Sequence, residues 1–383
     1  MSKKEHEKLE KRTVLIFSLA SFLNDMGSDM IYPLWPTFVT TVIKANMSIL
    51  GLIDGIGDAL NSISKAISGY LSDKIRKRKV FIWSGYLMGS ISRIGYAVSS
   101  VWQHLIPFKV LDRIGKLRGA PRDALISEVS TKKTRGRNFG ILRMMDNLGA
   151  VVGILLAIVL LPILGYRKLF ILASIPSLLG VLLIIAFIKD IPPKKQKHKF
   201  SIRLFDNNYK LFLLSSMLFS LGYFSYSFLL IYARSLGMSD VQLPIFYLIF
   251  TATASIFSVP FGKLSDRLGR KLTIFISYGI WILIGLIPLF LSNPLFAYLL
   301  FFLYGIQKAT YVPSVRAFIS ELSPSEYRAT GIGTFDMLVG LFSLPASFLA
   351  GILWDMYGYY VVFELSVVLT ILSILILLMV RRK

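Results

Sequence analysis

Long apolar runs recur along the whole chain, and they constrain its fold more than any other feature. Three of them are VVGILLAIVLLPILG, LFILASIPSLLGVLLIIAFI and VVFELSVVLTILSILILLMV. A helix needs about 20 apolar residues to cross a bilayer, and runs of this kind are too numerous here to share one buried core. The chain is 55% hydrophobic and only 17% charged, so we predict a multi-pass membrane protein that lies in the lipid bilayer.

The formal net charge of +22 invites comparison with nucleic-acid-binding proteins. Such a protein gathers its Lys and Arg residues on a soluble domain, whereas here they cluster in short segments between apolar runs. That distribution predicts no nucleic-acid partner. The absence of cysteine excludes disulfides and thiolate sites, and we found no nucleotide-binding loop and no cluster of histidines. We therefore expect no cofactor, no metal and no catalytic residues.

Hydrophobic windows separated by turns or charges predict twelve membrane spans. Their centres lie near residues 27, 57, 90, 115, 150, 178, 220, 252, 281, 307, 342 and 370. Pro33 and Pro36 interrupt the first span. The polar stretch 189–210 is the longest after the N-terminus. We therefore predict a six-helix bundle over residues 1–188, a cytoplasmic linker over 189–208 and a second six-helix bundle over 209–383.

Two motifs repeat at the same offset. GYLSDKIRKRK starts at Gly69 and GKLSDRLGRK starts at Gly262, which places Asp73 and Asp266 193 positions apart. ALISEVSTKKTRGRNFG and AFISELSPSEYRATGIG place Glu128 and Glu321 at that same separation. Two matches at one offset indicate gene duplication and two halves related by a pseudo-two-fold axis.

Basic residues crowd alternate polar segments, namely the N-terminus, the segments after the second, fourth and eighth spans, the linker and the final RRK. The positive-inside rule assigns such segments to the cytoplasm. We therefore expect a protein of the cell membrane with both termini in the cytoplasm.

These motifs resemble those of the major facilitator superfamily. The second copy matches the pattern G-x3-D-[RK]-x-G-x-[RK]-[RK] throughout, whereas in the first copy Arg76 replaces the second glycine. Glu128 to Arg135 and Glu321 to Arg328 both read E-x6-R. The resemblance covers essentially the whole chain. It implies an all-α membrane protein with the major facilitator fold, twelve transmembrane helices in two pseudo-symmetric six-helix bundles, monomeric and acting as a transporter of small molecules rather than an enzyme.

The motif residues are candidates for a conformational gate, because their charges can pair at one side of the membrane and separate when that side opens. The alternative is that the basic residues only set the membrane topology, which predicts neither the aspartate nor the glycine spacing. The candidate gate residues are Gly69, Asp73, Lys74, Arg78, Glu128, Arg135, Gly262, Asp266, Arg267, Gly269, Arg270, Lys271, Glu321 and Arg328.

Carboxylates inside the spans are candidate coupling residues, because ionisable groups are costly in a membrane. Asp25 and Asp29 lie four residues apart on one helical face and can share a proton; alternatively, both are solvated near the outer end of a broken helix. Asp54 and Asp58 belong to a polar stripe on the second span. That stripe either lines a cavity or forms internal salt bridges.

Basic residues inside the spans are the other candidates for the cavity or for coupling. Arg113 lies near the centre of the fourth span, where drug-proton antiporters of the resembled superfamily carry an arginine, although the motif around it matches only in part. Asp146 lies one turn from Arg143 and would neutralise it. The further basic candidates are Arg93, Lys308 and Arg316.

Glycines and aromatics add two weaker signals. Gly140, Gly149 and Gly153 match the front of the antiporter signature of that superfamily, but this spacing equally serves close helix packing. Aromatic residues around Tyr223, such as Phe224 and Tyr226, fall on spans that line the central cavity in that fold. Most aromatic residues of such a chain face lipid or the core instead.

The sequence therefore predicts a secondary active transporter that works by alternating access. The favoured function is proton-coupled export of a small organic compound, as an efflux antiporter whose partners are that compound and protons or another ion. The alternative is symport or exchange of an anionic small metabolite, which the basic residues within the spans favour. A membrane sensor or membrane enzyme is the third possibility, and the lack of a soluble domain argues against it.

Overall fold

The computed structural model describes residues 3–75, 77–131, 134–188, 190, 205–324 and 328–381, with residues 3, 4, 6, 65, 66, 69–74 and 328–330 described as backbone only. These residues form helices and connecting turns, with no strand among them. In this part of the chain, eight helices are long and apolar enough to cross a membrane. The all-helical class is confirmed, and the twelve crossings stay a prediction, although every predicted centre lies in a helix.

The helices follow one another closely along the chain. The 3₁₀ turns are η1 (Tyr32–Leu34) and η3 (Gly115–Arg118), and η2 (Phe38–Val42) is a π-turn. The α-helices are α1 (Lys3–Asp29), α2 (Trp35–Thr37), α3 (Met47–Ile75), α4 (Arg78–Val98), α5 (Trp102–Ile114), α6 (Gly119–Val129), α7 (Arg135–Phe187), α8 (Asn207–Gly222), α9 (Tyr226–Ser235), α10 (Leu243–Leu268), α11 (Arg270–Phe290), α12 (Leu295–Leu322), α13 (Arg328–Tyr357) and α14 (Tyr359–Met379).

The first span is broken where its prolines predict a break. α1 ends at Asp29, and η1, α2 and η2 follow, with Pro33 and Pro36 near the starts of η1 and α2. Proline is tolerated at the start of a helix because it has no N–H to leave unbonded. The fifth and sixth predicted spans both lie in α7, where Gly165 has a non-helical conformation with φ of 66°. Glycine adopts this positive φ at no steric cost.

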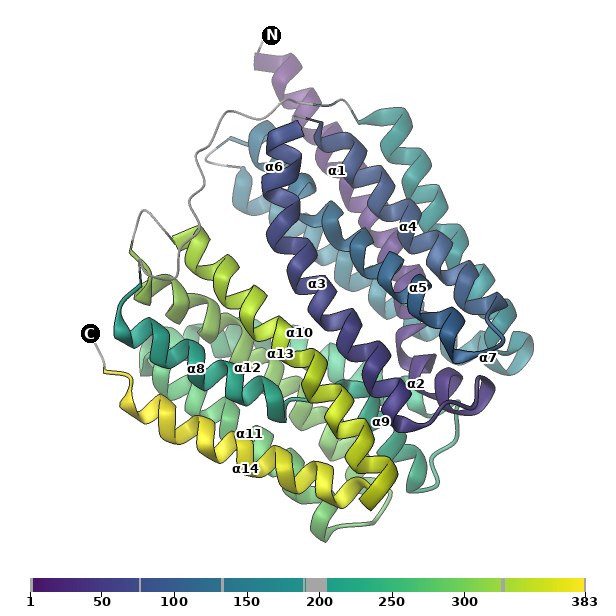
Figure 1. The fold of residues 1–383 in the computed structure, drawn as a ribbon. Coiled ribbons are helices and arrows are strands. Elements are labelled where there is room, and N and C mark those ends of the chain that lie inside the picture. Colours follow the sequence, from purple (N-terminus) through teal and green to yellow (C-terminus); the bar gives the residue numbers. More distant parts are fainter. Residues whose placement is uncertain are drawn as a thin grey trace. The chain divides into compact units, whose positions relative to one another are not determined.

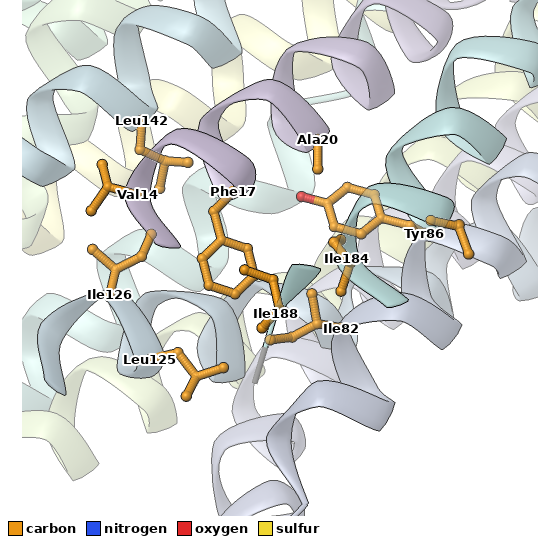
Figure 2. Packing of buried hydrophobic residues seen from close by; sticks show 11 residues of the cluster. Val14, Phe17, Ala20, Ile82, Tyr86, Leu125, Ile126, Leu142, Ile184 and Ile188 are labelled. Atoms are coloured by element: carbon orange, nitrogen blue, oxygen red, sulfur yellow. The ribbon is translucent and has the colours of Figure 1, made fainter. Parts of the chain in front are cut away.

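The chain forms two compact units. The first comprises Met1–Phe38 and Ile63–Lys197, and the second comprises Val39–Ser62 and His198–Lys383. In the first unit α1 packs along α7, and α4 packs on α7 and α5. Its core gathers apolar side chains from α1, α4, α6 and α7 around Phe17 (Figure 2). In a bilayer the lipid is as apolar as these side chains, so close van der Waals packing between them helps to hold the unit together.

In the second unit α14 lies beside α8 and α11, and α10 packs on α12 (Figure 1). The first half of α3 belongs to this unit, although the sequence places it in the first bundle. Gly51 and Gly55 explain its close packing on α13, because a Cβ at either position would collide with the backbone of Ser347 or Leu344. Small residues one turn apart allow this approach between membrane helices.

Candidate functional site

In each unit an arginine at the start of one helix pairs with a glutamate near the end of another. Arg78 begins α4 and lies 2.6 Å from Glu128 of α6. Arg270 begins α11, lies 2.9 Å from Glu321 of α12 and also pairs with Asp266 of α10. The two repeated motifs therefore meet each other in space within each unit.

The geometry matches the repeats with a shift of one residue. Glu128 and Glu321 are 193 positions apart, but Arg78 and Arg270 are only 192 apart. The next residue behaves alike in both copies, since Lys79 Nζ donates to the Ile185 carbonyl at 2.8 Å and Lys271 Nζ donates to the Leu378 carbonyl at 3.0 Å. The first copy thus holds one extra residue between Asp73 and Arg78.

The other motif residues lie at the ends of helices or within them. Gly269 ends α10 with φ of 91°, a conformation that favours glycine. Arg135 donates to the Ser127 carbonyl at 3.1 Å, and Arg267 is exposed in the last turn of α10. Gly262 lies within α10. The expectations for the Asp73, Lys74 and Arg328 side chains and for Gly69 fall on positions described as backbone only, and most of the predicted linker 189–208 lies outside the described residues.

Arg93 of α4 is the most completely bonded charge in the first unit. It is 2% exposed. Its guanidinium donates to Asn24 Oδ1 at 3.1 Å, to Ser28 Oγ at 2.8 Å and to the Ala173 carbonyl at 3.1 Å, and it also contacts Ser177 Oγ. These neutral acceptors use the donors of the arginine, so Arg93 ties α1 and α7 to α4 and is not aimed at a ligand.

The two candidate carboxylates of α1 differ. Asp25 accepts a hydrogen bond of 2.8 Å from the Asn24 amide. Asp29 is buried, and among the described residues it forms no hydrogen bond or ion pair. The charges that act on it electrostatically are those of Asp25, Lys116 and Arg93. Asp29 therefore differs from Asp25 in having no hydrogen bond to lose among the described residues, and neither carboxyl takes part in an ion pair there.

Arg113, expected near a coupling carboxylate, lies 3.5 Å from its neighbour Asp112 and above the ring of Tyr32 at 5.5 Å. Arg143 pairs with Asp146 at 3.1 Å and with Asp123 at 3.5 Å. The neutralisation of Arg143 by Asp146 is thus present in the structure.

The second unit contains a counterpart of the Asp123–Arg143 pair in which the acidic and the basic residue have exchanged positions. Arg316 of α12 lies 2.7 Å from Asp336 of α13. The offset of 193 equates Arg316 with Asp123 and Asp336 with Arg143. Each unit therefore joins the same two helix positions by an ion pair, but the acid and the base have changed places.

The span that holds α8 and α9 is broken between Gly222 and Tyr226. Ser225 caps α9, and its hydroxyl donates to Asp54 Oδ2 at 2.8 Å. Ser227 donates to the same oxygen. Asp54 is 5% exposed, so these hydroxyls satisfy a buried carboxylate of α3 within the second unit.

One turn further along α3, Asp58 lines a cavity of about 350 Å³ in the second unit. Lys308 lies in the middle of α12 and contributes a charge to the wall, with its ammonium 4.8 Å from the centre of the Tyr223 ring and 5.9 Å from that of Tyr304. The wall also contains Asn61, Ser62, Ser220, Phe224, Ser225, Tyr226, Tyr311, Val312, Val315, Arg316, Phe335, Asp336, Val339, Gly340 and Ser343.

The cavity joins several predicted residues and some that the sequence reasoning missed. Asp58, Lys308 and Arg316 were predicted, as were the aromatic residues around Tyr223. Tyr304 and Tyr311 were missed, although both lie at helical spacing from Lys308 on one face of α12. Asp336 was also missed, although it lies 193 positions after Arg143 and is therefore its counterpart in the second half.

No group of three or more potential metal ligands from His, Cys, Asp and Glu is present among the described residues. The cavity described above is lined by aromatic, hydroxyl and amide side chains together with a few charged groups. This chemistry suits the binding of a small organic molecule.

Comparison with known proteins gives a family match across the chain. The family model of the Major Facilitator Superfamily matches residues 17–230 and 211–383. An uncharacterized MFS-type transporter of Methanocaldococcus jannaschii is 38% identical over 98% of this chain and 96% of its own length. The multi-drug resistance efflux pump PmrA of Streptococcus pneumoniae is 24% identical over 82% of each chain.

Solved structures show the same fold. A mutant of the nucleoside transporter NupG superposes with a TM-score of 0.81 at 16% identity, covering 97% of this chain and all of the other. A bacterial homologue of the human lysosomal transporter Spinster superposes with a TM-score of 0.78 at 14% identity, covering 99% of this chain and 97% of the other.

Proposed function

The chain belongs to the major facilitator superfamily and is a membrane transporter of small molecules, not an enzyme, and from this premise we propose that it exports a small organic compound in exchange for protons. In this proposal the two halves alternate access to a binding site in the cavity of the second unit. The observation that carries it is this cavity, where charged and aromatic side chains converge at the middle of α12. The pneumococcal relative PmrA is an efflux pump, which supports export as the direction.

Asp29 is the proton carrier in this proposal. Its carboxyl is buried, has no ion-pair partner among the described residues and lies one turn from Asp25. Two carboxyls so close can share one proton. Lys116 and Arg93, whose charges act on Asp29, would hold the site polarised while the proton enters and leaves.

The Arg78–Glu128 and Arg270–Glu321 pairs are the gate elements of this proposal. The glutamate of each pair is partly or largely exposed, although Arg78 is buried, and an exposed pair contributes about 1 kcal/mol or less. Several such contacts suffice to bias two conformations that differ by a few kcal/mol. We further propose that the protein acts as a monomer in the cell membrane. The distribution of basic residues favours a cytoplasmic location for both termini.

Proteoliposomes that contain the purified protein and a trapped pH-sensitive dye test the coupling. A transported compound added outside should change the internal pH in the wild-type protein. Asp29→Asn should abolish that change while the compound still binds, because an amide cannot exchange a proton. Asp240→Asn is the matched control, since Asp240 pairs with Arg234 between α9 and α10, away from α1. Unchanged proton movement in Asp29→Asn would refute this role.

A second candidate function is symport or exchange of an anionic small metabolite. Of the basic residues predicted within the spans, Arg93, Arg113, Arg143 and Arg316 are held by protein partners. Lys308 is the one that faces the cavity without an ion pair among the described residues, and it is the specific observation that favours an anion.

A further inference from the structure

We propose that the cavity of the second unit binds a small organic anion that carries a planar ring, with its anionic group against the ammonium of Lys308. This inference rests on the proposed transport function and names the substrate class of the same cavity. Its basis is the contrast between Lys308 and the other charged side chain of α12 in the cavity wall.

That contrast is geometric. Arg316 is 2.7 Å from Asp336, so its charge is matched by the protein. Lys308 lies two turns earlier on α12, and no carboxylate of the described residues is within ion-pair distance of its ammonium. Asp58, which also lines the cavity, acts on it electrostatically. The ammonium instead lies over the rings of Tyr223 and Tyr304.

A cation in a membrane interior requires compensation, and cation–π contacts supply only part of it. Asp58 supplies a further part through its charge, and an anion in the cavity would supply the rest. A carboxylate or similar group would accept hydrogen bonds from an ammonium that is already held in place by two tyrosine rings. Such charge-assisted hydrogen bonds are among the stronger ones in proteins.

The rest of the wall indicates what the anion is attached to. Phe224, Tyr226, Tyr311 and Phe335 line the cavity with ring surfaces. Aromatic side chains pack on planar rings in offset or edge-to-face arrangements. The volume of about 350 Å³ is near the lower end for small-molecule sites, which favours a compact ligand. Asn61, Ser62 and Ser220 add hydrogen-bonding groups for ring substituents.

Three naphthalene probes of nearly equal shape test the assignment on the full-length protein in detergent. They are 2-naphthoate, the neutral 2-naphthamide and the cationic 2-naphthylmethylammonium, and their dissociation constants are measured by calorimetry. We expect 2-naphthoate to bind best. Lys308→Gln should weaken its binding by about tenfold or more, the loss expected for a charge-assisted hydrogen bond. Lys308→Arg should retain most of the affinity.

Lys168→Gln is the matched control, because Lys168 is an exposed lysine of the first unit, and it should bind 2-naphthoate as the wild-type protein does. Thermal unfolding of each variant identifies any that has lost its fold, and Lys308→Arg keeps the test valid if Lys308→Gln does not fold. Preferred binding of the cationic probe, equal binding by Lys308→Gln, or no binding of 2-naphthoate to the wild-type protein would overturn the assignment.

The experiments distinguish a failure of the proposed function from a failure of the ligand class. If the neutral or cationic probe binds and drives proton movement in proteoliposomes, the transporter proposal stands and only the anionic class is wrong. If 2-naphthoate binds at Lys308 but no compound drives proton movement, the ligand class stands and proton coupling is wrong.

Discussion

At the scale of single residues, the buried charges of the first unit divide into those that hold helices together and those that are able to change state. Arg93 belongs to the first kind, since Asn24, Ser28 and the Ala173 carbonyl all accept hydrogen bonds from its guanidinium. The proposed function assigns Asp29 to the second kind. An arginine stays charged at any relevant pH, so a fully bonded arginine contributes stability and position, not proton exchange.

Replacement of Arg93 by Gln should therefore destabilise the protein while leaving the cavity of the second unit intact. The shorter side chain leaves buried acceptors on α1 and α7 unsatisfied, at a cost of about 3 kcal/mol. Thermal unfolding in detergent measures the loss. Arg234→Gln removes an exposed pair with Asp240 and should change stability by about 1 kcal/mol or less. Equal stability of the two variants would contradict a structural role for Arg93.

At the scale of helices, three glycines of α7 show whether their match to the antiporter signature reflects antiport or only close helix packing. A Cβ at Gly149 would collide with the Phe22 carbonyl of α1, and one at Gly153 would collide with the Met26 carbonyl, whereas Gly140 has no atom of this kind within 4 Å. Close helix packing accounts for two of the three glycines that resemble the antiporter signature. The resemblance at these two positions is therefore no independent support for antiport.

The same three positions offer an internally controlled experiment. Gly149→Ala and Gly153→Ala should each lower stability by about 1–3 kcal/mol, because the added methyl group forces α1 and α7 apart. Gly140→Ala should be neutral or stabilise by up to about 1 kcal/mol, since alanine favours a helix over glycine. Unfolding midpoints of the three variants in one detergent make the comparison. If all three were equally stable, the close contact of α1 with α7 would not be what these glycines serve.

Local patterns predicted the elements well and their contacts less well. Pro33 and Pro36 predicted the break after α1, and the repeat offset predicted that Glu128 and Glu321 hold equivalent places. The ion pair Arg316–Asp336 was not predicted. Comparing the two halves residue by residue finds identical residues, and here the acidic and the basic residue have exchanged positions. The cavity was predicted only in part, since hydropathy indicates that a helix is buried but not which neighbour it meets.

At the scale of the whole molecule, duplication explains why one pairing scheme occurs twice. Each unit holds an Arg–Glu pair between the start of one helix and the end of another, and each holds an acid–base pair that includes Asp123 or its counterpart Arg316. In the proposed function the two Arg–Glu pairs belong to one gate. The energies involved are small, as reversible switching requires.

The paired substitution Glu128→Gln with Glu321→Gln should shift the conformational equilibrium without unfolding the protein. Loss of two partly exposed pairs changes the balance by about 1–2 kcal/mol, which corresponds to about a 5- to 30-fold change in population. The chain has no cysteine, so Ser220→Cys in the cavity wall reports accessibility through its rate of maleimide labelling. Glu7→Gln removes the exposed pair with Lys11 and should leave that rate unchanged. A labelling rate in the double variant equal to that of the Glu7→Gln control would mean that the Arg–Glu pairs stabilise both conformations equally and so form no gate.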